Sequence, residues 1–197
     1  VAGVEVTGHV GLARGAPANF EAAALLLIDQ LPRLKDGKIV LTDRSIQLAG
    51  MARELGGREA IAAALKGLPE GFSVADNAVK APPYIFQANK DPVAANVTFT
   101  GYVPDNTVHG ALVGTATRKF FDAKVVDQLK ASIGAPSGFA AAASAALGAL
   151  SRLSTGSLVM ADREIKLSGD ALYAAAADQI RAALANELPP GWKATAD

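Results

Sequence analysis

Few side chains in this sequence could carry out chemistry. Its 197 residues include two histidines, His9 and His109, and no cysteine. The lack of cysteine excludes disulfides, thiolate catalysis and zinc–thiolate sites. Neither histidine has a carboxylate at a recognisable spacing, and the sequence has no metal-binding motif, phosphate-binding loop or nucleophile elbow. This inventory predicts a protein that is not an enzyme and that has no catalytic residue, metal site or cofactor.

Two Asp-Arg pairs form the most specific polar pattern, because they recur at corresponding positions. The pairs are Asp43-Arg44 and Asp162-Arg163. One interpretation is a duplicated contact point for lipid headgroups or a partner. The other is turn chemistry, in which the Asp side chain bonds to its own backbone and the Arg is solvated. The four residues are therefore candidates for surface contact, with the turn as the alternative.

The pairs belong to an internal repeat. Residues 15–65 align without a gap onto residues 134–184, at an offset of 119, and 22 of the 51 positions are identical. One added residue in the second copy then extends the repeat to 15–76 and 134–196. A duplicated unit is typical of modular scaffold and binding proteins. We expect both copies to have the same fold.

Short alternating segments predict strands that end in glycine. Ile46–Gly50, Val97–Gly101 and Ile165–Gly169 share a β-branched, polar, apolar, small, Gly pattern. Alternation with a period of two indicates half-buried strands. We expect the structural glycines Gly50, Gly101 and Gly169 to occupy equivalent turns at the strand ends.

Apolar residues at helical spacing predict a helix at the start of each copy, over residues 17–34 and 137–153. The repeated apolar faces define an expected core, which comprises Phe20, Leu31, Leu48, Leu65, Phe139, Leu150, Leu167 and Leu184. Val4, Val6 and Val10 align with Ala123, Val125 and Leu129, so they predict the last strand of an earlier copy.

Composition limits the possible functions. Lys+Arg and Asp+Glu are 19 each, which argues against binding to nucleic acid or steering of an acidic substrate. The longest apolar run, Ala22–Ile28, is shorter than a bilayer span requires. The sequence starts without methionine or a signal peptide, so we expect a fragment whose export signal or membrane anchor, if present, lies outside it.

The strand–glycine–helix–strand arrangement resembles BON domains (bacterial OsmY and nodulation). The best match is Val97–Val103, then a helix over 107–119, then the valine-rich Lys124–Leu129. The arrangement also resembles the BON-containing periplasmic part of OmpA-family proteins in the bacterial outer membrane. That resemblance implies structural glycines, no catalytic residues, and a periplasmic location anchored to the cell envelope.

The expected fold is α+β, with tandem BON-like units whose small mixed β-sheets are covered by helices. Domain boundaries are expected at Pro82-Pro83, giving a truncated unit at 1–81 and a complete double unit at 82–197. The predicted function is a non-enzymatic binding module that contacts an envelope protein or a phospholipid surface, with homo-oligomerisation possible. The alternative is an assembly subunit of a ring or pore built from stacked βα modules.

Overall fold

The computed structural model describes residues 7–9, 11 and 14–197. It contains two compact units, Val1–Pro82 and Pro83–Asp197, with the boundary at the predicted linker. Two mixed sheets and their helices confirm the α+β class. The strand predicted from Val4, Val6 and Val10 lies outside the described residues.

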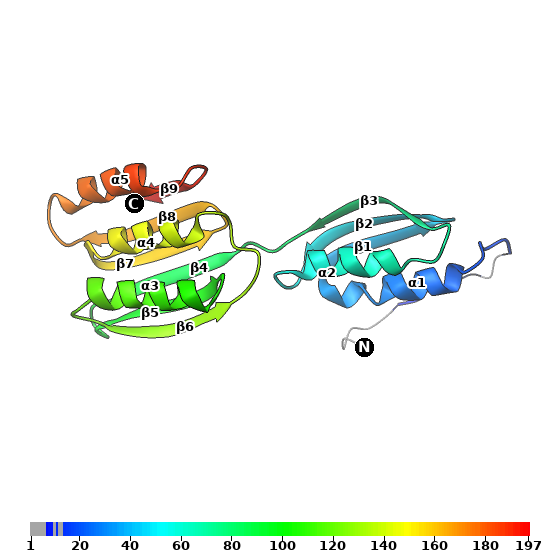
Figure 1. The fold of residues 1–197 in the computed structure, drawn as a ribbon, viewed down its shortest axis with the longest axis horizontal. Coiled ribbons are helices and arrows are strands. Elements are labelled where there is room, and N and C mark those ends of the chain that lie inside the picture. The colour runs from blue at the N-terminus through cyan, green and yellow to red at the C-terminus, as the bar shows by residue number, and fades with distance from the viewer. Residues whose placement is uncertain (1–6, 10, 12–13) are drawn as a thin grey trace. The chain divides into compact units, whose positions relative to one another are not determined.

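The first unit has a three-stranded sheet in the order β1-β2-β3. Strands β1 and β2 form an antiparallel hairpin, and β3 returns through a helix to lie parallel to β2. In Figure 1 the helices cover one face of this sheet. Its elements are α1 (Phe20–Ile28), the 3-10 turn η1 (Leu31–Arg33), β1 (Leu34–Thr42), β2 (Ser45–Ala52), α2 (Gly57–Ala64), η2 (Leu65–Gly67) and β3 (Ser73–Lys80).

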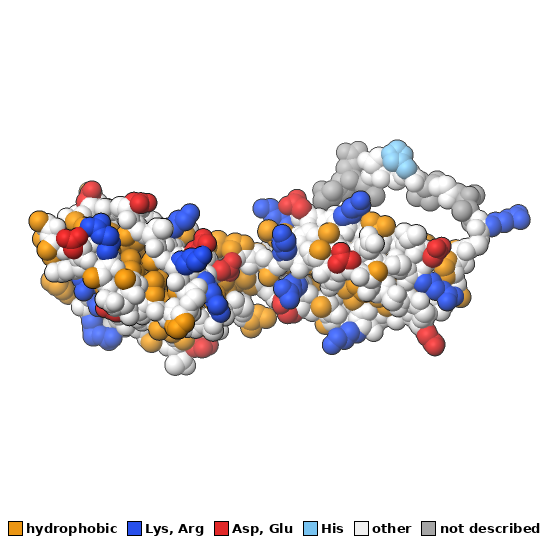
Figure 2. All heavy atoms as spheres, turned by 90° about the horizontal axis from the view of Figure 1, so that it is seen from above, with side chains coloured by type: hydrophobic (Ala, Val, Ile, Leu, Met, Phe, Trp, Pro, Cys, Tyr) orange, Lys and Arg blue, Asp and Glu red, His pale blue; other side chains and the backbone are white. Residues whose placement is uncertain are grey.

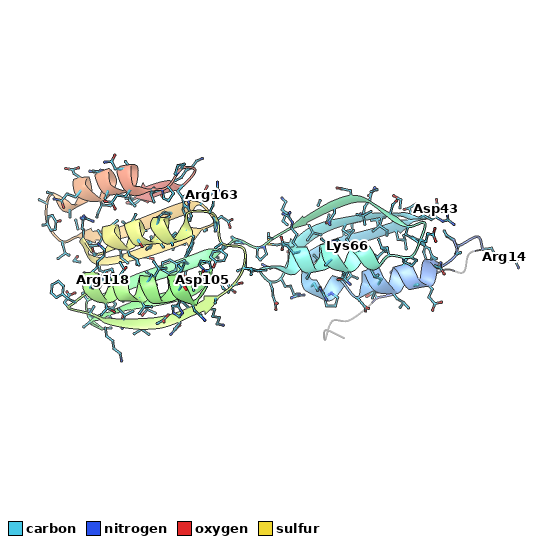
Figure 3. The ribbon with its side chains drawn as sticks, in the orientation of Figure 1. Arg14, Asp43, Lys66, Asp105, Arg118 and Arg163 are labelled. Atoms are coloured by element: carbon cyan, nitrogen blue, oxygen red, sulfur yellow. The ribbon has the colours of Figure 1, made fainter. Side chains whose placement is uncertain are left out.

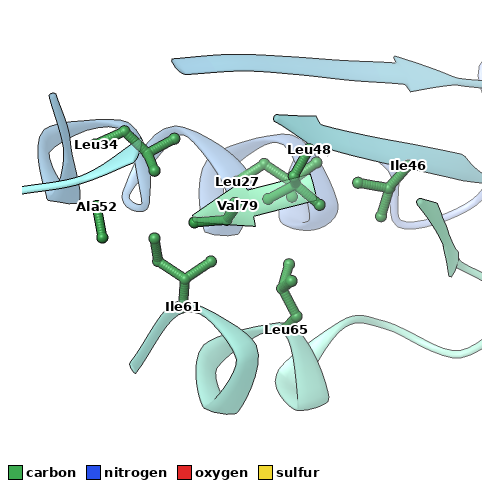
Figure 4. Close-up of a cluster of buried hydrophobic side chains, with 8 residues drawn as sticks. All are labelled: Leu27, Leu34, Ile46, Leu48, Ala52, Ile61, Leu65 and Val79. Atoms are coloured by element: carbon green, nitrogen blue, oxygen red, sulfur yellow. The ribbon is translucent and has the colours of Figure 1, made fainter. Parts of the chain in front are cut away.

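The core of the first unit lies between the sheet and the helices. Alternation along β2 directs Ile46 and Leu48 to the same face, where they meet Ile61 and Leu65 from the following helical segment. Figure 4 shows this cluster, which comprises Leu27, Leu34, Ile46, Leu48, Ala52, Ile61, Leu65 and Val79.

The second unit has a six-stranded sheet in the order β6-β5-β4-β7-β8-β9. Helix α4 contacts both α3 and α5, and lies between them in Figure 1. The elements are β4 (Ile85–Asp91), β5 (Asn96–Val103), α3 (Asn106–Lys119), β6 (Lys124–Ala131), α4 (Phe139–Leu150), β7 (Leu153–Ala161), β8 (Glu164–Ala171), α5 (Ala176–Glu187) and β9 (Lys193–Ala196).

This sheet is built from two similar halves. Each half is a strand–strand–helix–strand segment, β4-β5-α3-β6 or β7-β8-α5-β9, which we call a half-unit. The half-units join where β4 pairs antiparallel with β7. Ala88 lies opposite Leu158 in that pair, with Phe86 opposite Met160 and Lys90 opposite Gly156. This symmetric pairing gives an approximate two-fold axis that passes between Ala88 and Leu158. Helix α4 is an addition between the half-units.

The repeated sequences have the same topology. Elements α1-β1-β2-α2-β3 correspond in order and strand pairing to α4-β7-β8-α5-β9. Even the irregularity in the hairpin recurs, between Leu34 and Asp36 in one copy and between Leu153 and Thr155 in the other. The sequence offset of 119 is therefore also a structural correspondence.

The prediction that three glycines form turns at strand ends was wrong. Gly50, Gly101 and Gly169 lie inside β2, β5 and β8, where each strand continues for two more residues. Their φ angles are +143°, +100° and +150°. A Cβ at these positions would overlap a backbone carbonyl oxygen of the adjoining strand. Glycine is needed here because neighbouring backbones approach closely within the sheet.

Candidate functional site

The structure gives one histidine a partner that the sequence analysis missed. The His109 Nε2 of α3 lies 2.6 Å from the Asp127 Oδ2 of β6, on a partly exposed surface. The residues are 18 positions apart, and the return of β6 beside β5 brings them together. No group of three potential metal ligands occurs among the residues that the structure describes. The pair therefore joins a helix to an edge strand.

The repeated Asp-Arg pairs occupy hairpin turns. Asp43 and Asp162 both have φ of +53°, a left-handed conformation that Asp tolerates better than most residues. In the second unit the Arg163 Nη2 donates a hydrogen bond to the Ser137 Oγ at 2.8 Å. The two Asp residues thus occupy equivalent turns, and all four side chains are exposed.

Among the residues that the structure describes, charged side chains do not converge on a site in either unit. Figure 2 shows basic and acidic side chains interspersed over the displayed face of each unit. In Figure 3, Asp105 and Arg118 lie at opposite ends of α3. No helix in the described part of the chain is long and apolar enough to span a bilayer.

A shallow hollow of about 420 Å³ lies in the second unit, beside α5 and β9. Arg181 is its one ionisable lining residue, and its guanidinium pairs with Asp178 at 2.7 Å. Trp192, also in the lining, donates its indole N–H to the Ser137 carbonyl oxygen. This hollow lacks the convergent polar groups of a catalytic pocket.

The first unit has an apolar groove of about 210 Å³ between α1 and β1. Its lining comprises Phe20, Ala24, Leu27, Ile28, Leu31, Ile39 and Leu41, with no charged or polar side chain. Ile28 is 57% exposed and Leu31 is 41% exposed, and the neighbouring Leu25 is 57% exposed. These three residues place large apolar side chains in solvent along one helical segment, which is uncommon without a binding role.

The groove corrects part of the predicted core. Leu48, Leu65, Phe139, Leu150, Leu167 and Leu184 are buried, but Phe20 is only half-buried and Leu31 is exposed. The helix predicted over 17–34 ends at Ile28 and is followed by η1. Both exceptions lie in the first copy, although their counterparts Phe139 and Leu150 belong to the core.

An open strand edge adjoins the groove. Strand β1 pairs with β2 on one side, and in the described sheet nothing pairs with its other side. An unpaired edge offers alternating backbone N–H and C=O groups to an incoming strand. The first unit therefore presents an apolar surface together with a row of backbone hydrogen-bonding groups.

The second unit buries both features. The counterparts of the groove residues are all at most 3% exposed: Phe139, Ala143, Ala146, Leu147, Leu150, Leu158 and Met160. Strand β4 pairs with the edge of β7 that corresponds to the open edge of β1. The rings of Tyr84 and Phe86 lie against Phe139, with centroid separations of 5.4 and 6.0 Å. The half-unit β4-β5-α3-β6 thus covers the surface that the first unit exposes.

Hydrogen bonds join the two half-units at both ends of the β4·β7 pair. Tyr84 donates its backbone N–H to the Asp162 Oδ1, and Asp162 returns its own N–H to the Tyr84 carbonyl, both at 2.9 Å. At the other end, the buried Lys90 donates its Nζ hydrogen to the Leu153 carbonyl oxygen at 2.8 Å. Burial, with a smaller contribution from Asp105, raises the pKa of Tyr84 to about 12.

Comparisons with known proteins add no family. No protein-family model matches the chain, and no curated protein matches it in sequence. The candidate site therefore rests on the difference between the two copies. It is the groove of the first unit together with the open edge of β1.

Proposed function

We propose that the chain is a non-enzymatic interaction module that binds another protein through its first unit. The main support for this proposal is the exposed groove beside β1. In the second copy the same surface is buried under the half-unit β4-β5-α3-β6. Large exposed apolar surfaces commonly mark interaction sites. An open strand edge favours a protein partner over a lipid surface, since another strand can form a ladder of hydrogen bonds with its row of backbone groups and a lipid surface cannot.

The setting that we propose is the periplasm, where the module would serve a protein of the cell envelope. The resemblance of residues 97–129 to BON domains supports this setting. The interspersed charges in Figure 2 support a partner bound through shape and apolar contact. Electrostatic attraction of the whole chain to an anionic surface would need an excess of one sign of charge, and the formal net charge is zero.

Site-specific photo-crosslinking in cells that produce the protein tests the proposal. A photoreactive residue at Ile28 should give discrete adducts with another protein, because this side chain faces the groove. The exposed Ala62 on α2 is the matched control and should give few adducts. Adducts with lipid alone, or equal labelling at both positions, would contradict the proposal.

The same experiment examines the alternative of a ring or pore subunit. Such an assembly would yield adducts between copies of the chain. Sedimentation velocity over a range of concentrations would then show species that grow with concentration.

A further inference from the structure

We propose that the groove and open β1 edge of the first unit bind a half-unit, a strand–strand–helix–strand segment with no helix before its first strand. This inference rests on the proposed function and specifies its partner. The bound half-unit would pair antiparallel with β1 and complete a six-stranded sheet like that of the second unit.

The register of β1 on β2 is the first observation that supports the half-unit as the partner. Strand β1 has the register on β2 that β7 has on β8, with Gly37 opposite Gly50 and Gly156 opposite Gly169. The far edge of β7 receives β4 through Ile85–Lys90. A strand in the position of β4 would therefore meet β1 with the same pairing geometry.

The position of the first helix defines which protein fits. In the second unit α4 lies between α3 and α5, and the half-unit that covers it has no helix of its own before β4. Two first units paired through β1 would bring two copies of α1 to the place that a single α4 fills. A half-unit avoids this crowding, so it fits better than a second copy of the first unit.

A carboxylate at the hairpin turn supports the same partner. Asp162 accepts the backbone N–H of Tyr84 at the start of the incoming strand. Its counterpart Asp43 has the same left-handed φ, and no described residue donates a hydrogen bond to its carboxylate. Asp43 is therefore placed to receive the first amide of a strand that pairs with β1.

Charge complementarity identifies a feature of the partner's helix. In the second unit Lys119, in the last turn of α3, places its Nζ 3.5 Å from the point where a Cβ on Gly148 would lie. The first copy has Asp29 at the position of Gly148, at the carboxyl end of α1, and no described Lys or Arg forms an ion pair with it. A carboxylate at a helix carboxyl end is unfavourable unless a cation neutralises it. We therefore expect a Lys or Arg in the last turn of the partner's helix.

The first copy also differs in side-chain size. The exposed Leu25 stands where α4 has Ser144. The natural partner should therefore carry smaller side chains beside Leu25 than the half-unit β4-β5-α3-β6 of the second unit does.

A graft onto the chain tests the proposal. Residues 83–133 are duplicated and fused ahead of Gly15, because the connector Gly15-Ala16-Pro17 recurs as Gly134-Ala135-Pro136 where β6 leads into α4. A second version adds Leu25→Ser, so that the graft meets at this exposed position the side chain that its counterpart Ser144 presents in the second unit. Hydrogen exchange of the β1 amides is compared with the unmodified chain.

Outward-facing amides between Asp36 and Thr42 should exchange at least about 100-fold more slowly in one or both grafted versions, because they become hydrogen-bonded within a sheet. Lys119→Glu in the grafted copy should reduce this protection, and Lys130→Glu on the exposed β6 should not. Unchanged exchange in both versions would overturn the half-unit proposal, whereas protein adducts at Ile28 would still support a protein-binding function. A dimer of the unmodified chain with protected β1 amides would also overturn it, by assigning the groove to a second copy.

Discussion

Helices α1 and α4 occupy the same place in the repeat, but their apolar faces meet different neighbours. Ile28 and its counterpart Leu147 are both large aliphatic residues, yet Ile28 is 57% exposed and Leu147 is fully buried. The contrast follows from β4 and α3, which cover α4 and have no described counterpart over α1. An apolar face thus marks a surface that can be buried, and the neighbouring half-unit determines whether it is.

The largest expected loss of stability comes from replacing the strand glycines. It should be equal in the two copies if both have the same sheet geometry. We expect Gly50→Ala and Gly169→Ala each to lower the free energy of unfolding by about 2–6 kcal/mol, from strain at positive φ plus overlap with a backbone carbonyl. Denaturant-dependent hydrogen exchange, resolved by unit, measures the loss. Gly110→Ala, which has open space for a Cβ, is the control. A loss below 1 kcal/mol in either copy would show that its strand accepts a side chain.

The second prediction concerns burial directly. Leu150→Ala should destabilise the second unit by about 2–5 kcal/mol, because it removes a fully buried side chain. Leu31→Ala at the corresponding position should cost less than about 1 kcal/mol, since this residue is already 41% exposed and its loss opens no enclosed cavity. Equal losses from the two variants, measured by chemical denaturation, would remove the basis of the comparison.

Alkaline pH should distinguish the units, because every tyrosine of the chain lies in the second one. Tyr84 keeps its proton up to about pH 12 in the folded protein, but an unfolded tyrosine loses it near pH 10. The stability that Tyr84 contributes is therefore complete below about pH 10 and is lost as the pH rises toward 12, at no more than about 1.4 kcal/mol per pH unit. Tyr84→Phe should remove this component from the pH profile of the second unit. An unchanged profile in the variant would contradict the assignment.

The smallest effect sharpens the role of the hairpin turns. Asp43→Ala and Asp162→Ala remove the same left-handed Asp, but only Asp162 also accepts the Tyr84 N–H. We expect Asp162→Ala to cost about 1 kcal/mol more than Asp43→Ala. The difference is measured by parallel denaturant titrations of the two variants, and its absence would mean that the Tyr84 contact adds no stability.

The repeat made much of the fold predictable from the sequence. Alternating residues around Leu48 and Leu167 predicted half-buried strands with these two residues in the core, and both residues are buried. Local patterns could not predict the β4·β7 pairing, because it joins residues about 70 positions apart. The same limitation led to the wrong expectation for Leu31, which follows α1 in the turn η1 and has no covering partner among the described residues.

The candidate site was less predictable than the fold. The Asp-Arg pattern drew attention to two turns, but the site depends on an open edge, which only a sheet topology reveals. His109 and Asp127 show the same difficulty, because no short motif connects a helix to the strand that follows it. The strand glycines were recognised as special, but their spacing did not show that a neighbouring carbonyl excludes a side chain.

The open edge of β1 also has a consequence for how we expect the protein to behave in concentrated solution. The first half of the strand carries the exposed charges Lys35, Asp36 and Lys38, whereas Val40 and Leu41 follow in the second half. Charged edge residues oppose the stacking of strands from different molecules, and an apolar edge promotes it. With a formal net charge of zero, the molecules have little general repulsion to keep them apart. Resistance to aggregation then depends on these few charges, so added salt that screens them should shorten the storage life of the chain.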